Sequence, residues 1–138
     1  DMLATLPKLG PKRARWLYPI KSLADSGAIL ALGSDWHVST VNPLEAIQVA
    51  ITRQPLGKKT QKALNPEECI TLLQALQAYT FGSAYANFWE HQTGSLEVGK
   101  SADLVVLSDN LFEIPVSKIS KARVLMTFFE GKEVFRAL

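Results

Sequence analysis

One short stretch of the chain constrains its fold more than any other feature. Residues 28–32, Ala-Ile-Leu-Ala-Leu, form a continuous apolar run that is followed at once by the turn residues Gly33, Ser34 and Asp35. The run is too short for a helix, and unbroken apolar strands are typical of a parallel sheet that is buried on both faces. Parallel α/β folds build their sites at the carboxyl ends of the strands. The run therefore predicts an α/β fold with Asp35 at the functional edge.

Helix signals lie on both sides of this predicted strand. Pro19 suits a first helical turn, the next apolar residues have helical spacing, and Gly27 marks a stop. Beyond the strand, Asn42, Pro43 and Glu45 occupy the N-cap, N1 and N3 positions of a helix with one apolar stripe. We therefore expect the order helix, strand, loop, helix.

The middle of the chain predicts two more helices. Residues 65–68, Asn-Pro-Glu-Glu, repeat the same capping pattern ahead of apolar residues at helical spacing, among which Cys69 is expected to be a core residue of the helix. We expect this helix to break around residues 81–83. A shorter helix then carries Tyr85, Phe88 and Trp89 toward a core.

The composition changes beyond His91, which we expect to be solvated in a polar turn. Three short runs rich in branched and aromatic residues, 104–107, 124–129 and 133–135, predict strands, the last two joined as a hairpin through residues 130–132. A boundary near residue 90 thus divides the chain into an α/β part, residues 1–90, and a small β part, residues 91–138.

Asp35 is the residue most suited to catalysis, although a turn-shaping role is the alternative that the pattern leaves open. Trp36 beside it is a candidate wall of a substrate pocket, or a packing residue. His37 is a candidate metal ligand, proton shuttle or pocket residue, or a plain loop residue. A metal site would need two or more further ligands that the chain does not offer.

Residues 94–101 match the phosphate-binding pattern G-x-x-x-x-G-K-[ST]. That site requires a strand before the loop and a helix after it, so that backbone amides face the phosphates. The sequence predicts a helix before Gly94 and a strand after Ser101, and Glu97 would place an anion in the loop. A nucleotide site is therefore disfavoured.

Charge and cysteine content exclude several classes of protein. With 15 basic and 13 acidic residues, the net charge of +2 favours neither nucleic acid nor a membrane surface as a partner. One cysteine and two histidines exclude a disulfide scaffold and a zinc finger. The free thiol favours a reducing compartment such as the cytoplasm, with the localisation otherwise open. Because the chain opens with Asp1 and shows no signal peptide, we expect a cut end there.

Further residues carry a resemblance to a known family. The chain resembles the amidohydrolase superfamily, in its YtcJ-like branch, over essentially its whole length. The matching stretches are Leu17-Tyr18-Pro19, Ser22-Leu23, Gly27, Gly33-Ser34-Asp35-Trp36, Asn42-Pro43-Leu44, Ala78-Tyr79-Thr80, Ala84-Tyr85-Ala86, Gly94 to Lys100, Ala102 to Leu107, Asn110-Leu111-Phe112, Ile114-Pro115, Val124, Thr127 and Gly131-Lys132.

The resemblance implies the C-terminal segment of a (β/α)8 TIM barrel plus part of a β-sandwich assembled from both chain ends. Residues 28–32 would be the eighth barrel strand. Asp35 would bind a divalent metal, usually zinc, and relay a proton from the metal-bound water to the leaving nitrogen. The other metal ligands of the family have no counterpart in this sequence, so we expect the 138-residue chain alone to bind zinc weakly and to hydrolyse nothing.

The function implied by the resemblance is hydrolysis of a non-peptide carbon–nitrogen bond of a small molecule. Family members often have proline where this chain has His37, so His37 is a candidate substrate contact of its own. The alternative is a non-catalytic accessory domain or a degenerate homologue. The sequence leaves open whether the protein forms a homo-oligomer. With 47% hydrophobic and 20% charged residues, the chain carries more apolar surface than a small domain needs to bury.

Overall fold

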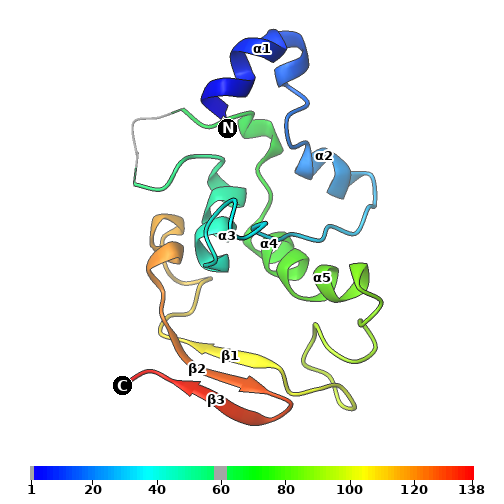
Figure 1. Ribbon diagram of the computed structural model, residues 1–138, viewed down its shortest axis with the longest axis vertical. Coiled ribbons are helices and arrows are strands. Elements are labelled where there is room, and N and C mark those ends of the chain that lie inside the picture. Colours follow the sequence, from blue (N-terminus) through cyan, green and yellow to red (C-terminus); the bar gives the residue numbers. More distant parts are fainter. Residues whose placement is uncertain (1, 58–61) are drawn as a thin grey trace.

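The chain begins with helices and ends with strands (Figure 1). The structure, a computed structural model, describes residues 2–57 and 62–138. In chain order, the helices of these residues are α1 (Met2–Ala14), α2 (Ile20–Asp25), α3 (Pro43–Thr52), the 3-10 helix η1 (Pro66–Glu68), α4 (Leu72–Tyr79), α5 (Phe81–Ala86) and the 3-10 helix η2 (Val116–Lys121). The strands are β1 (Leu104–Leu107), β2 (Val124–Phe129) and β3 (Lys132–Arg136). The mixed content confirms the α/β class, although the described residues form neither a closed barrel nor a second sheet.

The predicted strand over residues 28–32 is wrong. No strand forms there, and the backbone N–H of Leu32 donates instead to the carbonyl of Ala78, in α4, at 3.1 Å. A parallel strand needs a neighbouring strand to accept its ladder hydrogen bonds. Within the described residues only β1, β2 and β3 are paired, so the run lies against helices.

The predicted cap of α3 is confirmed. The Asn42 side chain accepts a hydrogen bond from the N–H of Leu44 at 3.0 Å, and Pro43 begins the helix. The short helix predicted after Pro19 is confirmed as α2. Both elements are stabilised by local signals, which explains why they can be recognised in the sequence.

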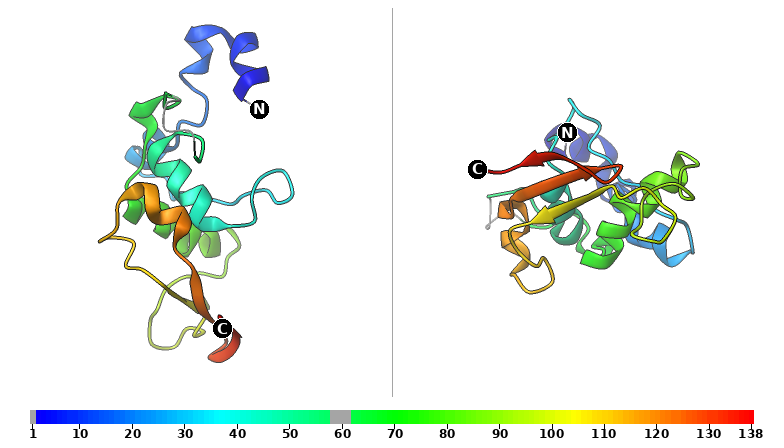
Figure 2. Two further views of the ribbon diagram at one scale, coloured as in Figure 1. Left: turned by 90° about the vertical axis from the view of Figure 1, so that its left-hand side faces the viewer. Right: turned by 90° about the horizontal axis from the view of Figure 1, so that it is seen from below.

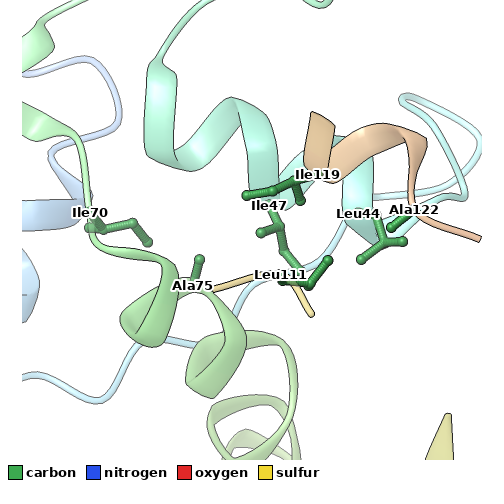
Figure 3. Close-up of a cluster of buried hydrophobic side chains, with 7 residues drawn as sticks. All are labelled: Leu44, Ile47, Ile70, Ala75, Leu111, Ile119 and Ala122. Atoms are coloured by element: carbon green, nitrogen blue, oxygen red, sulfur yellow. The ribbon is translucent and has the colours of Figure 1, made fainter. Parts of the chain in front are cut away.

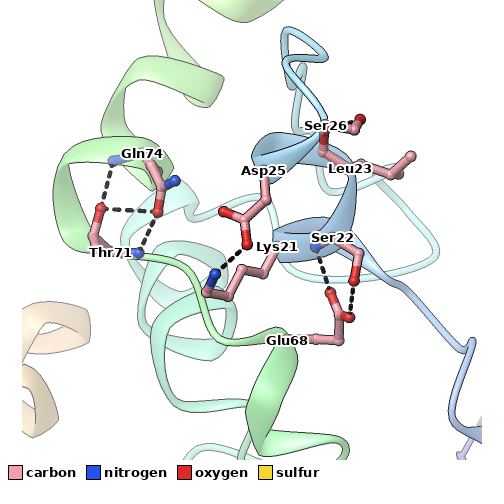
Figure 4. A network of polar contacts seen from close by, with 8 residues as sticks. All are labelled: Lys21, Ser22, Leu23, Asp25, Ser26, Glu68, Thr71 and Gln74. Carbon is pink, nitrogen blue, oxygen red and sulfur yellow. Dashed lines mark hydrogen bonds and ion pairs between the residues drawn. The ribbon is translucent and has the colours of Figure 1, made fainter.

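The predicted cap of α4 at Asn65 is wrong. Thr71 caps this helix, with its hydroxyl accepting from the N–H of Gln74 and the Gln74 side chain accepting from the N–H of Thr71 (Figure 4). Asn65 adopts a left-handed conformation, and its side-chain amide donates to the Ala14 carbonyl at 2.9 Å. Cys69 consequently lies between η1 and α4 rather than in a helix, and it is partly buried.

The three predicted strands are confirmed and form one antiparallel sheet in the order β1-β2-β3. The hairpin turn is made by Glu130 and Gly131, both with positive φ (49° and 76°), as the two-residue turns of hairpins require. Asp103 holds this turn, because its carboxylate accepts from the N–H of Glu130 at 2.8 Å. The sheet lies at the opposite end of the molecule from α1 (Figure 1).

The hydrophobic core lies between α3, α4 and η2 (Figure 3). Its buried side chains are Leu44, Ile47, Ile70, Ala75, Leu111, Ile119 and Ala122. They come from both sides of the boundary expected near residue 90, so the two parts share one core, and their separation as domains stays a prediction.

The aromatic residues at the end of α5 and just after it do not point into this core, contrary to the prediction. Tyr85, Phe88 and Trp89 are 46%, 88% and 60% exposed. Because α5 ends at Ala86, Phe88 and Trp89 fall in the turn that follows and lose the helical direction that would have aimed them inward. The described helices include none that is long and apolar enough to cross a membrane.

Candidate functional site

The loop that carries Asp35 is held at both ends. Upstream, Leu32 is hydrogen-bonded to the junction between α4 and α5, through its N–H to Ala78 and through its carbonyl to the Ser83 hydroxyl at 3.0 Å. Downstream, the N–H of Asn42 donates to the Thr40 hydroxyl at 3.1 Å, next to the cap of α3. Between these points the loop projects from the body of the molecule, as the cyan segment ahead of α3 in Figure 2.

Asp35 occupies a tight backbone turn within this loop. Its φ is 50°, a left-handed value that aspartate tolerates better than most residues, and its carbonyl accepts from the N–H of Val38 at 2.6 Å. The carboxylate is exposed and makes no hydrogen bond or ion pair with the described part of the chain. Both carboxylate oxygens are therefore available to an external group, while the left-handed φ keeps the turn-shaping alternative open.

Trp36 and His37 are exposed on the same loop, Trp36 by 67%. The three predicted site residues thus follow one another on one exposed loop, and none of them lines the hollow between α5 and β1. Among the residues that line this hollow are Phe81, Trp89, Leu96 and Val105. A pocket wall made by Trp36 and His37 stays a prediction.

A complete metal centre is not formed by this part of the chain. Across residues 2–57 and 62–138 there is no group of three or more His, Cys, Asp or Glu side chains that could hold a metal ion. Structural and catalytic zinc sites take at least three protein ligands. Asp35 can supply one carboxylate ligand, and the described residues do not fit a metal by themselves.

Two buried charged side chains fix the backbone that leads toward the loop, and the sequence predicted neither. The guanidinium of Arg53, only 8% exposed, donates to the carbonyls of Leu64 (2.8 Å), Tyr18 (3.1 Å) and Leu17 (2.9 Å). It therefore joins the segment ahead of α2 to the end of α3. A buried arginine with three carbonyl partners has no local sequence signal.

Glu68 binds the first turn of α2 (Figure 4). Its carboxylate accepts from the N–H of Ser22 at 2.9 Å and from the Ser22 hydroxyl. These two hydrogen bonds lower the pKa of Glu68 below its ordinary value, with a smaller contribution from the Arg53 charge. In the sequence Glu68 resembles a residue of a helix N-terminus, whereas its partner lies 46 residues away.

The phosphate-loop pattern at 94–101 is a loop that closes on itself, between α5 and β1. The ammonium of Lys100 donates to the Ser95 hydroxyl at 2.6 Å and to the Glu97 carboxylate at 3.2 Å. Hydrogen bonds from Ser95 and Lys100 lower the pKa of Glu97. The lysine is thus engaged inside the loop, and the helix that a phosphate site needs after the loop is replaced by a strand, as the sequence predicted. His91 is exposed, also as predicted.

Comparison with known proteins identifies the family. Residues 2–135 match the model of the amidohydrolase family, so the chain belongs to that family. The branch that the sequence resembles is supported as well, because the chain is 30% identical to YtcJ of Bacillus subtilis (strain 168), a protein with an amidohydrolase name, over 98% of this chain and 26% of that protein.

Further relatives have different names. The chain is 43% identical to Protein LONG AFTER FAR-RED 3 of Arabidopsis thaliana, over 98% of this chain and 23% of that protein. It is 31% identical to N-substituted formamide deformylase of Arthrobacter pascens, over 83% of this chain and 21% of that protein. The chain therefore spans between 21% and 26% of the length of these relatives.

A solved structure has a similar fold. An amidohydrolase from Thermotoga maritima MSB8 superposes with a TM-score of 0.60 at 30% sequence identity. The superposition covers 86% of this chain and 26% of that one.

Proposed function

We propose that this chain supplies the C-terminal portion of a metal-dependent amidohydrolase that hydrolyses a non-peptide carbon–nitrogen bond of a small molecule. The observation that carries the proposal is the free, exposed carboxylate of Asp35, on an anchored loop of a chain that matches the amidohydrolase family over residues 2–135. The names of its relatives, an amidohydrolase and a deformylase among them, support this class of reaction.

In the complete enzyme, residues 1–90 would belong to the final part of a (β/α)8 barrel and residues 91–138 to a small β-sandwich. The similarity to the Thermotoga amidohydrolase over 26% of its length supports such a placement. The exposed aromatic residues after α5 and the single three-stranded sheet support it as well, because both present apolar surface that neighbouring protein would bury.

Asp35 would be one ligand of the metal and the residue that moves the proton. A divalent metal, zinc being the usual one, would supply an activated water when bound. Asp35 would accept a proton on its carboxylate and deliver it to the leaving nitrogen, which a carboxylate can do if it stays within hydrogen-bond reach of both. Trp36 and His37 would line the substrate pocket from the same loop.

The test is an Asp35→Asn substitution in the complete enzyme, assayed against a panel of N-formyl and N-acetyl amines. Loss of the proton carrier should lower kcat by about 10³-fold, within the usual range for an acid–base residue. Asp109→Asn, which changes an exposed carboxylate after β1, is the matched control and should leave kcat unchanged. An Asp35→Asn enzyme with near-normal kcat would remove Asp35 from the mechanism.

A non-catalytic module is the second candidate, favoured by the absence, among the described residues, of any group of three or more side chains that could hold a metal ion. Metal analysis separates it from the enzyme. The complete protein should retain a divalent metal through gel filtration, whereas the 138-residue chain should lose it. One tightly held zinc per 138-residue chain would contradict our account of the site, and a complete protein without metal or activity would favour the module.

A further inference from the structure

We propose that Ser83 is a positioning residue for Asp35. Its hydroxyl lies at the junction of α4 and α5 and fixes the backbone three residues before Asp35. This inference rests on the proposed function, because it concerns how the proposed catalytic carboxylate is held in place.

Both backbone groups of Leu32 are bound at one point of the junction. The N–H of Leu32 donates to the Ala78 carbonyl at 3.1 Å, and its carbonyl accepts from the Ser83 hydroxyl at 3.0 Å. The same hydroxyl lies 2.9 Å from the Ala78 carbonyl. Since a hydroxyl has a single proton, it is shared between the two carbonyls, and Ser83 closes a compact set of contacts around Leu32.

Gly82 permits this close approach. A Cβ atom at position 82 would lie 1.8 Å from the Leu30 carbonyl oxygen and 3.0 Å from its carbon, both of them backbone atoms. The backbone of residues 30–32 therefore rests directly against the first turn of α5, in space that only glycine leaves free. This contact brings Leu32 within reach of the Ser83 hydroxyl.

The anchor matters for Asp35 because only Gly33 and Ser34 separate it from Leu32. On its other side, Asp35 is held by the hydrogen bond from Val38 at 2.6 Å. If the upstream contact is lost, the carboxylate can shift while the rest of the fold is kept. A displacement of about 1 Å at a reacting group can lower the rate by about 10²-fold.

The first measurement is amide hydrogen exchange on the 138-residue chain. In Ser83→Ala, the amide of Leu32, which donates to the Ala78 carbonyl, should exchange about tenfold faster, while those of α3 stay unchanged. Ser26→Ala is the matched control, because the Ser26 hydroxyl donates to the Leu23 carbonyl at the end of α2, at 2.7 Å, outside the junction of α4 and α5. Ser83→Thr keeps the hydroxyl and should restore slow exchange.

Unchanged exchange at the Leu32 amide in Ser83→Ala would overturn the proposal whatever the activity. If Ser83→Ala does not fold, Ser83→Cys, which keeps a weak donor on a somewhat larger atom, should show intermediate protection. Protection equal to that of the unsubstituted chain in Ser83→Cys would equally overturn it.

The second measurement is steady-state kinetics on the complete enzyme. Ser83→Ala should lower kcat by about 10- to 100-fold with KM within about twofold, because substrate binding is retained while the carboxylate is displaced. Ser83→Thr should rescue kcat. Asp35→Asn is assayed in parallel. If exchange rises in Ser83→Ala but kcat does not fall, while Asp35→Asn is inactive, the positioning role is wrong and the proposed function stands. If Asp35→Asn is itself active, the proposed function fails.

Discussion

Two buried charged side chains, Arg53 and Glu68, bind the residues around α2. Arg53 and Glu68 are 8% and 5% exposed, and both are satisfied by hydrogen bonds to backbone or hydroxyl groups. A buried ionised group is tolerated only when its hydrogen-bonding capacity is met, and removing one partner leaves the other desolvated and unpaired. These two side chains therefore fix how α2 and the segment before it meet α3 and η1.

Glu68 should make the stability of the chain depend on acid. Because its pKa is lower in the folded state than in the unfolded state, its ionised form stabilises the fold above the unfolded value, and this contribution is lost as pH falls through the folded pKa. The Tm of the unsubstituted chain should therefore fall as the pH is lowered below about 4.5, the ordinary pKa of a glutamate. In Glu68→Gln, Tm at neutral pH should be lower and its decline below this pH shallower.

Circular dichroism melts at several pH values would measure this effect. Glu113→Gln, at an exposed carboxylate, is the control and should keep the steeper acid dependence. The decline should become shallower in Glu68→Gln without vanishing, since hydrogen bonds also lower the pKa values of Glu97 and Glu133. An acid dependence in Glu68→Gln as steep as in the unsubstituted chain would contradict this account.

Among the elements, the loop between α5 and β1 packs closely against α5 at one glycine. Gly94 has φ of 90°, and a Cβ there would lie 2.6 Å from Cβ of Ala84 and 3.1 Å from Cα of Phe81. Gly99 in the same loop has φ of 94° but open space around it. Gly99 thus needs glycine only for its positive φ, whereas Gly94 needs it both for its positive φ and for lack of space for a Cβ atom.

Gly94→Ala should therefore destabilise the chain more than Gly99→Ala. Both substitutions force alanine into a left-handed region, at about 1–2 kcal/mol. Gly94→Ala adds a clash in a packed site, at about 1–3 kcal/mol. Urea denaturation of the two variants measures the difference in the free energy of unfolding. Equal losses would mean that the loop moves away from α5 without resistance.

Elements with local hydrogen-bond partners could be predicted from the sequence. The cap of α3 at Asn42 and the hairpin turn at Glu130 and Gly131 depend on residues within a few positions of one another. The run at 28–32 has the composition of a buried strand, but a strand also needs a partner, and the partner of Leu32 in this structure is a helix. Asn65 has the composition of a cap, but its side chain binds Ala14, 51 residues away.

In the candidate site, too, residues with local signals could be predicted and residues with distant partners could not. Asp35 could be found because a turn follows an apolar run directly in the sequence. Ser83 could not, because its contact with Leu32 spans 51 residues and no local pattern distinguishes this serine from others near a helix start. The sequence predicts a break around residues 81–83, whereas the interruption lies just before them, at Thr80, and residues 81–83 begin α5. The role of the interruption has no signal in the sequence.

On the scale of the whole molecule, the chain exposes far more surface than its mass requires. A compact monomer of 15.2 kDa would expose about 7,100 Å². The structure exposes 9787 Å². The excess is larger than the roughly 800 Å² that each partner buries in a standard interface. The high apolar content noted in the sequence is consistent with this excess.

The 138-residue chain should therefore associate with itself as its concentration rises. Val105 and Phe135, 53% and 48% exposed, both lie in register with Thr127 of β2 and so share one face of the sheet. Sedimentation velocity should show a growing apparent mass, which the Val105→Lys/Phe135→Lys double variant reduces. Leu23→Lys, at an exposed site on α2, is the control and should not. A constant monomer mass at all concentrations would contradict the expectation.

The interruption at Thr80, between α4 and α5, implies a trade-off between thermal stability and activity. In an unbroken helix the Ala78 carbonyl would accept from the N–H four residues later, whereas here it is available to Leu32. Substitutions at residues 80 and 81 that favour one continuous helix would raise the thermal stability of α4 while depriving the Asp35 loop of its anchor. A programme of thermostabilisation should leave residues 80–83 unchanged, because the gain measured by melting would come at the expense of turnover.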